Sequence, residues 1–275
     1  MVAKTDMRPG EIVKTIDPIW DALRQEAALA AEREPVLATF FYATVLNQAS
    51  LEESVIHRIS ERLDHADVSA SVIRQAFLDL RDEMPEWGKI LRVDIQAFYD
   101  RDPACIRFLE PVLYFKGFHA IQTHRLAHWL LGHGRRDFAL YLQSRASSVF
   151  QTDINPAARI GMGIFLDHAT GLVVGETAAI GDNVSILHGV TLGGTGKEGS
   201  DRHPKIGNGV LIGAGAKILG NIHIGHCSRV AAGSVVLKPV PPKTTVAGVP
   251  AKVVGEAGCS EPSRSMDQLL APYEI

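Results

Sequence analysis

The 275-residue sequence has few cysteines and no cysteine-rich motif. Cys105, Cys227 and Cys259 are far apart, odd in number and outside any CxxC spacing. This pattern is typical of free thiols in a reducing compartment, so we expect a cytoplasmic protein without a disulfide framework. It also gives no support for a metal site of the structural zinc type.

Long apolar runs and a strong excess of one charge are absent as well. No run of 18 apolar residues occurs, and the N-terminal segment lacks the apolar core of a signal peptide, so no membrane partner is expected. The formal net charge is -3. A value this small predicts no general attraction to nucleic acid or to anionic lipid.

A six-residue period is what the second half of the chain does contain. Aliphatic residues recur every six positions from Ile154 to Leu172, resume in a shifted register at Val174, and recur again from Ile206 to Val236. Glycine often follows the aliphatic residue, as at Gly161 and Gly207. This period fits neither an α-helix nor a meander of hairpins. It predicts a parallel β-helix of four to five coils, in which each short strand contributes one inward side chain.

The first half has the period of α-helices instead, so the fold class is α+β. We predict an all-α domain over residues 1–150, a β-helix over residues 151–255 and a flexible, aperiodic tail over residues 256–275. Expected helices include residues 36–47, 51–63, 69–82, 93–99, 118–131 and 138–149.

One extended loop interrupts the β-helix. The six-residue period is lost between Leu192 and Ile206, where the segment GGTGKEGSDRHPK is inserted. An insertion in a solenoid leaves the prism as a loop, usually on a binding face. Glycine, cationic residues and histidine in this loop suit an anionic ligand. The letters GTGKEG do not indicate a dinucleotide-binding turn, because Pro204 follows and no helix opens there.

Asp167 and His168 fall at a corner of the predicted prism. Leu166 is the inward residue, so the two polar residues that follow are exposed. Asp153 lies fifteen residues earlier, about one rung away, where a carboxylate can orient an imidazole that accepts a proton. A solvated surface histidine with an incidental aspartate is the alternative.

Three further polar residues have a structural and a functional interpretation each. Arg202 and His203 are either a solvated loop tip or a site for a substrate carboxylate. Asp102, which precedes a proline, is either a cap or turn residue or a counter-ion for an amine. The histidines of HRLAH, at 124–128, lack the glutamate and third ligand of a zinc site, so packing is the better interpretation.

At these residues the sequence resembles the serine O-acetyltransferase family over nearly its whole length. The resemblance rests on long motifs in order, which are RDPA at 101–104, YFKGFHAIQ at 114–122, DINPAARIGMG at 153–163, LDHATGLVVGETA at 166–178, VTLGGTGK at 190–197, DRHPKIG at 201–207, IGAGAKILGNI at 212–222 and AGVPAKVVG at 247–255.

The resemblance implies acetyl transfer from acetyl-CoA to L-serine, the first step of cysteine biosynthesis, with L-cysteine as feedback inhibitor. It implies a left-handed β-helix, a homotrimer with active sites between neighbouring prisms, and pairing of trimers into a hexamer. It makes His168 the general base and Asp153 its orienting carboxylate. The residues implied to hold serine or cysteine are Asp102, Asp167, Arg202 and His203.

The same resemblance implies a groove for acetyl-CoA and a protein partner. The groove would contain Gly194, Ala214, Ala232 and Lys252. The terminal Ile275 would enter the active site of cysteine synthase (O-acetylserine sulfhydrylase). Because a thioester is already activated, an imidazole that takes the serine proton suffices for direct transfer, with no permanently bound cofactor and no acetyl-enzyme.

Three rival interpretations remain open at the level of sequence. One is a hexapeptide acyltransferase that acts on a sugar or antibiotic hydroxyl. Another is a non-catalytic β-helix scaffold. The third is a γ-class carbonic anhydrase, which needs three metal-binding histidines, whereas His168, His188 and His203 are irregularly spaced.

Overall fold

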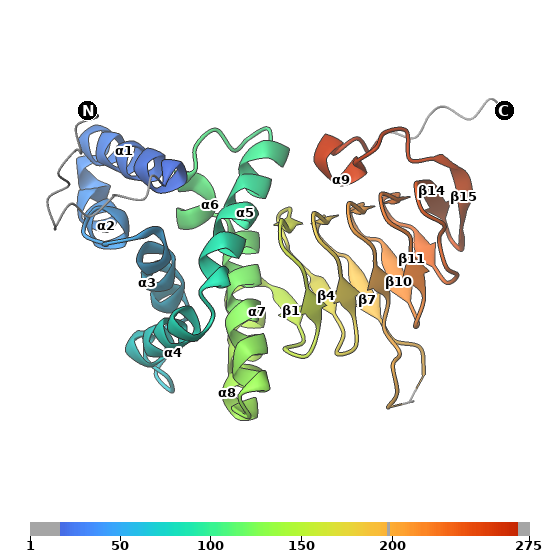
Figure 1. The fold of residues 1–275 in the computed structure, drawn as a ribbon, viewed down its shortest axis with the longest axis horizontal. Coiled ribbons are helices and arrows are strands. Elements are labelled where there is room, and N and C mark those ends of the chain that lie inside the picture. Colours follow the sequence, from blue (N-terminus) through green and yellow to red (C-terminus); the bar gives the residue numbers. More distant parts are fainter. Residues whose placement is uncertain (1–16, 197–198, 269–275) are drawn as a thin grey trace, which may run out of the picture.

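A computed structural model describes residues 17–196 and 199–268. It contains an all-α domain followed by a parallel β-helix, as predicted, and the two parts lie end to end along the longest axis (Figure 1). The helices are α1 (Pro18–Arg33), the 3-10 turn η1 (Pro35–Leu37), α2 (Ala38–Phe41), the π-helical turn η2 (Tyr42–Leu46), α3 (Leu51–Leu63), α4 (Ala70–Glu83), α5 (Glu86–Arg101), α6 (Leu109–Leu113), α7 (Lys116–Gly132) and α8 (Arg136–Phe150).

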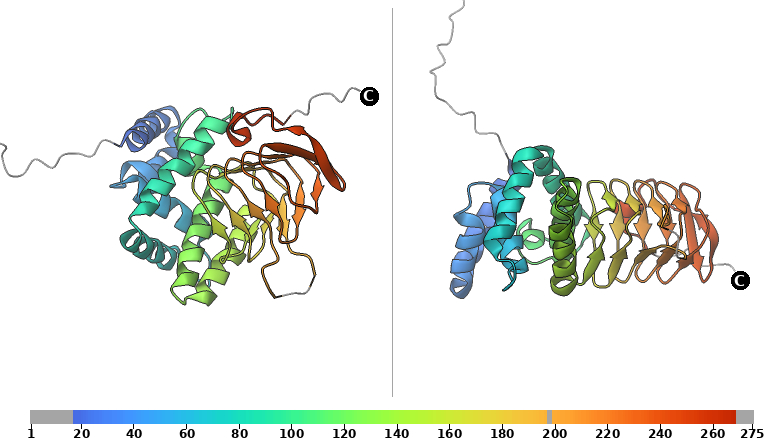
Figure 2. Two further views of the ribbon diagram at one scale, coloured as in Figure 1. Left: turned by 45° about the vertical axis from the view of Figure 1, so that its right-hand side comes forward. Right: turned by 90° about the horizontal axis from the view of Figure 1, so that it is seen from below.

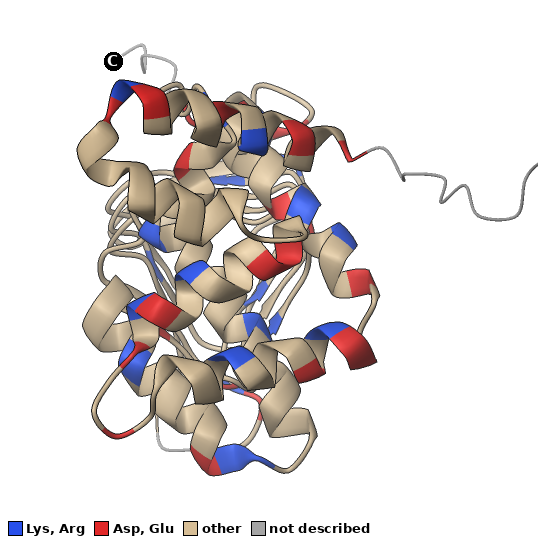
Figure 3. Cartoon of the chain, turned by 90° about the vertical axis from the view of Figure 1, so that its left-hand side faces the viewer, with Lys and Arg blue, Asp and Glu red and all other residues tan. Residues whose placement is uncertain are grey.

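Local sequence signals account for the first residues of α1 and α3. Asp17 caps α1, where its carboxylate accepts a hydrogen bond from the Trp20 amide, and Pro18 occupies the first helical position. Ser50 caps α3 in the same way. The helix predicted at residues 93–99 is longer in the structure, where α5 begins at Glu86 and ends at Arg101. Basic and acidic residues are interspersed along the helices at this end of the molecule (Figure 3).

The β-helix is a three-sided prism of five coils. Sheet A contains β1 (Thr152–Ile154), β4 (Leu172–Val174), β7 (Thr191–Gly193), β10 (Lys217–Leu219) and β13 (Val235–Val236). Sheet B contains β2 (Arg159–Ile160), β5 (Ala179–Ile180), β8 (Lys205–Ile206) and β11 (His223–Ile224). Sheet C contains β3 (Phe165–Leu166), β6 (Ser185–Ile186), β9 (Leu211–Ile212), β12 (Arg229–Val230), β14 (Thr244–Gly248) and the antiparallel β15 (Ala251–Glu256). Figure 2 shows these sides along the prism.

The inward aliphatic residues of the repeat stack to form the core of the prism. Ile180, Ile186 and Ile212 are buried, and their strands pair with the equivalent strands of adjacent coils. This core is continuous with that of the helical domain. Phe165 of β3 lies 4.9 Å, centroid to centroid, from Phe98 of α5 in an edge-to-face contact. The helical domain therefore covers the open end of the first coil and shares its hydrophobic core.

The predicted flexible tail is partly packed. Within it, α9 (Pro262–Ser265) lies against the prism, Pro262 and Ser263 are buried, and the Ser185 hydroxyl donates to the Ser263 carbonyl at 2.7 Å. Arg229 donates to the Asp267 carbonyl at 2.9 Å. Residues 262–267 of the predicted tail thus contact the prism through bonds from prism side chains to backbone, which follow no sequence period. Residues 269–275 of the predicted tail, with Ile275, lie outside the described residues.

Candidate active site

The corner between sheets C and A in the first coil is larger than its successor. Phe165 pairs with Ser185 and Val173 pairs with Thr191. The step from Phe165 to Val173 is thus eight residues long, whereas the equivalent step in the next coil, from Ser185 to Thr191, is six. The two extra residues form a bulge in which His168 and Ala169 both have left-handed backbone, with φ of 55° and 57°. Non-glycine residues rarely adopt this conformation, and such strain is concentrated at functional sites.

This bulge faces a cavity of about 650 Å³ between the helical domain and the first two coils. Asp102, the residue that caps the C-terminus of α5, reaches the cavity together with Asp167 and His168. The structure therefore unites residues that are about 65 positions apart in the sequence. His168 Nε2 lies 3.7 Å from Asp167 Oδ1, and the imidazole is 75% exposed. It is accessible to a substrate.

Asp167 is the electrostatically unusual group of this cavity. Burial raises the pKa of its carboxyl above the ordinary value, His168 opposes that rise, and the nearby carboxylate of Asp102 adds to it. Two acidic groups in one partly buried place repel each other when both are ionised. A ligand ammonium group would relieve this repulsion.

Two cavity residues were not assigned to the site from sequence. His188 occupies the same corner one coil further on, with its ring centroid 6.0 Å from that of His168. Its position twenty residues after His168, the length of the enlarged coil, is the signal that identifies it. Lys116 begins α7 and donates to Gln151 and Thr170 beside the bulge. For Lys116 the sequence offers no comparable signal.

Asp153 lies apart from this cavity within the single chain. It is exposed on β1, pairs with Val173 across the sheet, and accepts a hydrogen bond from Gln143 Nε2 at 2.6 Å. It is not among the residues that line the cavity. Its neighbour in the described structure is thus an amide of α8 rather than the His168 imidazole.

Arg202 and His203 lie at the corner between sheets A and B, where the extended loop returns. Arg202 Nη2 pairs with Glu176 at 2.8 Å. His203 is 7% exposed, and its ring covers Gly175, where an added Cβ would lie 2.0 Å from the ring. Glycine is therefore required there for steric reasons. These two residues are not the solvated tip of the loop.

Thr177 fixes both of these residues. Its hydroxyl accepts hydrogen bonds from the amides of Arg202 at 3.0 Å and His203 at 3.1 Å, so its proton points to His203 Nδ1 at 2.8 Å. The Thr177 amide also donates to Nδ1. Since Nδ1 accepts, the neutral ring carries its proton on Nε2. Burial, with help from Arg202 and Lys205, lowers the pKa of His203 and favours this neutral form.

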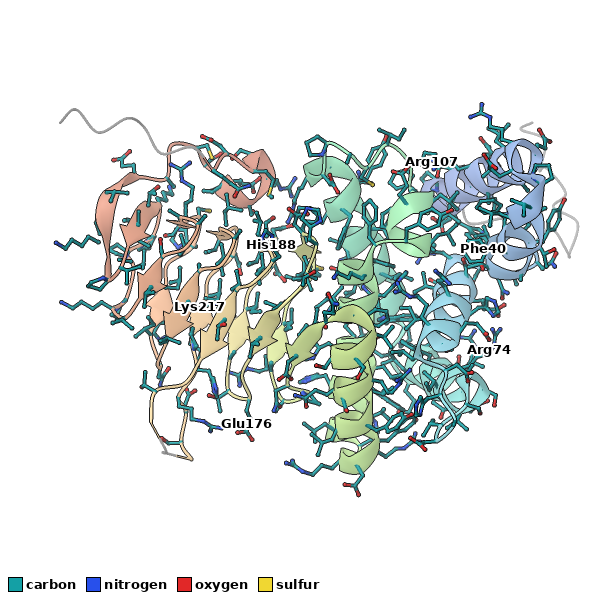
Figure 4. All side chains as sticks on the ribbon, turned by 180° about the vertical axis from the view of Figure 1, so that it is seen from behind. Phe40, Arg74, Arg107, Glu176, His188 and Lys217 are labelled. Carbon is teal, nitrogen blue, oxygen red and sulfur yellow. The ribbon has the colours of Figure 1, made fainter. Side chains whose placement is uncertain are left out.

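The predicted site residues thus form two groups at two corners of one prism. Asp102, Asp167 and His168 share the cavity at the C–A corner, whereas Arg202 and His203 belong to the A–B corner. Figure 4 shows His188 and Glu176, one from each corner, at opposite edges of the prism. His203 is therefore not brought to His168 and His188 within the chain, as a three-histidine metal site would require. No cluster of three or more metal-ligating side chains occurs among the described residues.

The residues predicted to line the acetyl-CoA groove likewise lie at different places on the prism. Ala214 and Ala232 continue the corner of His168 and His188, linked by bonds from Gly215 N to the His188 carbonyl and from Gly233 N to the Ala214 carbonyl, each 2.8 Å. Lys252 is exposed on β15 at the end of the prism, opposite Ala247. Gly194 lies at the other corner, where an added Cβ would approach the Arg202 side chain at 3.1 Å.

A prism of six-residue repeats with an exposed imidazole beside two carboxylates places the chain in the class of hexapeptide-repeat acyltransferases. Family comparison agrees. The family model "Serine acetyltransferase, N-terminal" matches residues 19–123, and "Bacterial transferase hexapeptide (six repeats)" matches residues 203–238. Serine acetyltransferase of Escherichia coli strain K12 is 51% identical over 253 residues, 92% of this chain and 93% of the relative.

Solved structures give the same result. Serine acetyltransferase from Brucella abortus strain S19 in complex with coenzyme A is 70% identical, with a TM-score of 0.88 over 89% of this chain and 98% of the other. Soybean serine acetyltransferase complexed with serine is 52% identical, with a TM-score of 0.84 over 86% and 97%. A serine acetyltransferase complex with cysteine is 47% identical, with a TM-score of 0.90 over 92% and 98%.

The chain therefore belongs to the serine acetyltransferase family. The resemblance identified from the sequence motifs is confirmed, and so is the predicted fold class. In the part of the chain that the structure describes, no helix is long and apolar enough to cross a membrane.

Proposed function

We propose that the protein transfers the acetyl group of acetyl-CoA to the hydroxyl of L-serine and releases O-acetyl-L-serine and CoA. The observation that carries this proposal is the shared cavity of His168, Asp102 and Asp167. An imidazole for the hydroxyl proton and two carboxylates for an ammonium group match the two ends of an amino alcohol.

His168 acts as general base in this proposal. Its imidazole takes the hydroxyl proton while the serine oxygen attacks the thioester carbonyl. The tetrahedral intermediate then collapses, the carbon–sulfur bond breaks, and the imidazolium returns the proton to the leaving thiolate. His168 is exposed in a strained bulge, so it can meet both substrates. We propose that His188, the next histidine of the same corner, contacts the acetyl-CoA side of the reaction, because its ring lies 6.0 Å from that of His168.

The serine carboxylate requires a second group of residues, which we propose comes from a neighbouring subunit. Arg202 and the Nε2–H of His203 suit a carboxylate, but they lie at a different corner from His168. A homotrimer of parallel prisms brings the C–A corner of one chain against the A–B corner of the next. The same arrangement would join Gly194 to Ala214 and Ala232 in one acetyl-CoA groove that ends near Lys252.

Asp153 is proposed to orient the His168 imidazole once substrates and subunits are assembled. Gln143 holds one of its oxygens, which leaves the other for the imidazole. We also propose that L-cysteine competes with serine, since the two differ by one atom. One relative has been solved in complex with serine and another in complex with cysteine, which supports binding of both amino acids.

Larger assemblies and the cellular setting follow from the family resemblance. We propose that trimers pair into hexamers through the helical domains, and that Ile275 binds cysteine synthase. A cytoplasmic location suits the three free cysteines. Loss of binding to the cognate sulfhydrylase on deletion of Ile275, measured by calorimetry with serine acetylation retained, would support the partner assignment. Unchanged affinity would exclude it.

The proposed reaction is tested by release of CoA thiol from acetyl-CoA with and without L-serine. We expect strong dependence on L-serine and little response to sugar alcohols or aminoglycosides. A preference for either of those acceptors would instead favour a hexapeptide acyltransferase of a different specificity. Absence of thiol release with every acceptor would favour a scaffold.

A further inference from the structure

A buried arginine with no acidic hydrogen-bond partner ends α5. Arg101 is 5% exposed, and all four of its hydrogen bonds within the described residues go to neutral oxygen atoms. Burial lowers the pKa of its guanidinium group to about 10, so the group is a cation at neutral pH. A buried cation is costly unless its donors are well satisfied, which suggests a task beyond packing.

The guanidinium group joins α5 to the first two coils of the β-helix. Nη1 donates to the Gly163 carbonyl at 3.0 Å and to the Ser185 hydroxyl at 3.1 Å, and Nη2 donates to Asn183 Oδ1 at 3.3 Å. Asp94, two helical turns earlier, accepts the Gly163 amide at 2.8 Å. The carbonyl and the amide of Gly163 are thus both hydrogen-bonded to side chains of α5.

The turn at Gly163 has a backbone conformation and a close packing that favour the contact with Arg101. Gly163 has a φ of 71°, and an added Cβ would lie 2.5 Å from Asn183 Oδ1, the oxygen that accepts from Arg101. Asn183 is itself left-handed, with a φ of 54°. The end of α5 that carries Arg101 lies over the first strands beside α9 (Figure 1). Its position relative to the β-helix is therefore set by specific bonds rather than by apolar contact alone.

The next residue, Asp102, belongs to the cavity. Its amide donates to the Phe98 carbonyl at 3.1 Å, and its Oδ1 accepts the Ala104 amide at 2.9 Å. One carboxylate oxygen is thus used locally, and the side chain is fixed relative to the helix end. Where that carboxylate lies relative to Asp167 then depends on where the β-helix holds α5.

We propose that Arg101 is a positioning residue that sets the distance between Asp102 and Asp167, and thereby the affinity for the amino group of the acceptor. The inference rests on the proposed function, because it takes the two carboxylates as the ammonium site. Arg101 is not among the residues that line the cavity. It acts through Asp102 alone.

The test is Arg101→Lys in the full-length protein. A lysine keeps the charge but lacks the fork that reaches Gly163 and Asn183 together. We expect the KM for L-serine to rise by about 10- to 100-fold, in line with the cost of misplacing a binding group by about 1 Å, while the KM for acetyl-CoA is unchanged. A serine KM equal to that of the wild type would overturn the proposal.

Arg125→Lys is the matched control. Arg125 of α7 is also an arginine between the helices and the first coil, but half-buried, with bonds to Asp94 at 2.7 Å and to the Gly161 carbonyl at 2.9 Å. Its loss should lower the melting temperature without changing the serine KM. If both variants raised the serine KM equally, general loosening of the domain junction would be the cause.

A double mutant separates positioning from a merely structural role. In an Asp102→Ala background, Arg101→Lys should cause no further rise in the serine KM, whereas multiplicative effects would contradict action through Asp102. If Arg101→Lys does not fold, Asn183→Gly removes one acceptor, retains the left-handed turn, and should raise the serine KM a few-fold; an unchanged value would again overturn the proposal. Failure of the wild type to acetylate serine would refute the proposed function instead.

Discussion

The regular coils of the β-helix and its two enlarged corners have different tasks. In regular coils, strands such as β11 and β12 follow the six-residue period and bury one aliphatic residue each. The C–A corner of the first coil gains two residues and carries His168. The A–B corner of the third coil gains eight, since Thr191 to Lys205 replaces the six-residue step from Val173 to Ala179, and it carries Arg202 and His203. Departures from the period are where chemistry can be placed without loss of core.

Among the substitutions that test this comparison, removal of the His168 imidazole should have the largest effect on activity. For His168→Ala we expect kcat to fall by about 10²–10⁴-fold, the usual loss for a general base, with the melting temperature unchanged. His223→Ala is the matched control, because His223 is an exposed histidine on the regular strand β11. Near-normal turnover of the His168 variant, measured by thiol release, would remove His168 from the reaction.

A substitution in a regular coil should do the reverse. Ile212 is fully buried, so Ile212→Ala should cost about 2–5 kcal/mol of unfolding free energy. At a temperature where the variant remains folded, its kcat should equal that of the wild type. Chemical denaturation gives the first quantity and steady-state kinetics the second. A large loss of kcat in the folded variant would mean that coils and corners are not separable.

The role of Thr177 at the A–B corner predicts a smaller, specific effect. Thr177→Val keeps the shape but removes the hydroxyl that fixes His203, so the KM for serine and the inhibition constant for cysteine should both rise about tenfold. Thr177→Ser retains the hydroxyl and should behave as wild type. If valine and serine variants gave the same KM, the hydroxyl would not matter.

The pKa of Asp167 predicts the smallest effect, and it is one of stability. Because the folded state raises this pKa, the folded protein binds more protons than the unfolded chain between the two pKa values. The unfavourable contribution is therefore absent below the ordinary aspartate pKa and complete above the raised one. Asp167→Asn should raise the melting temperature at pH 7, and the difference should vanish in acid. A variant less stable than wild type at pH 7 would contradict this.

Periodicity accounts for the parts of the molecule that repeat, and for little else. The change of register between Leu172 and Val174 in the sequence corresponds to the enlarged corner of the first coil. The loss of the six-residue period after Leu192 corresponds to the extended loop. Asp167 and His168 could therefore be placed at an exposed corner from sequence. That Asp102 joins them depends on how α5 lies across the first coil, and only the family resemblance indicated it.

Buried polar residues account for most of what the sequence did not show. Asp94 and Arg101 are buried, although charged residues of a helix such as α5 are expected to face water. Ser185 and Arg229 bind the backbone of residues 263 and 267, so an aperiodic segment is packed. Such contacts follow from three-dimensional complementarity rather than from a sequence period.

The central claim is that each active site combines the His168 corner of one subunit with the Arg202 corner of another. Co-expression of His168→Ala and Arg202→Ala chains with different tags, followed by purification on both tags, tests it most directly. Every mixed trimer of a cyclic assembly has one interface of three with both native residues, so we expect about a third of wild-type activity from two nearly inactive parents. Mixed trimers as inactive as the parents would contradict the account, because each site would then lie within one chain.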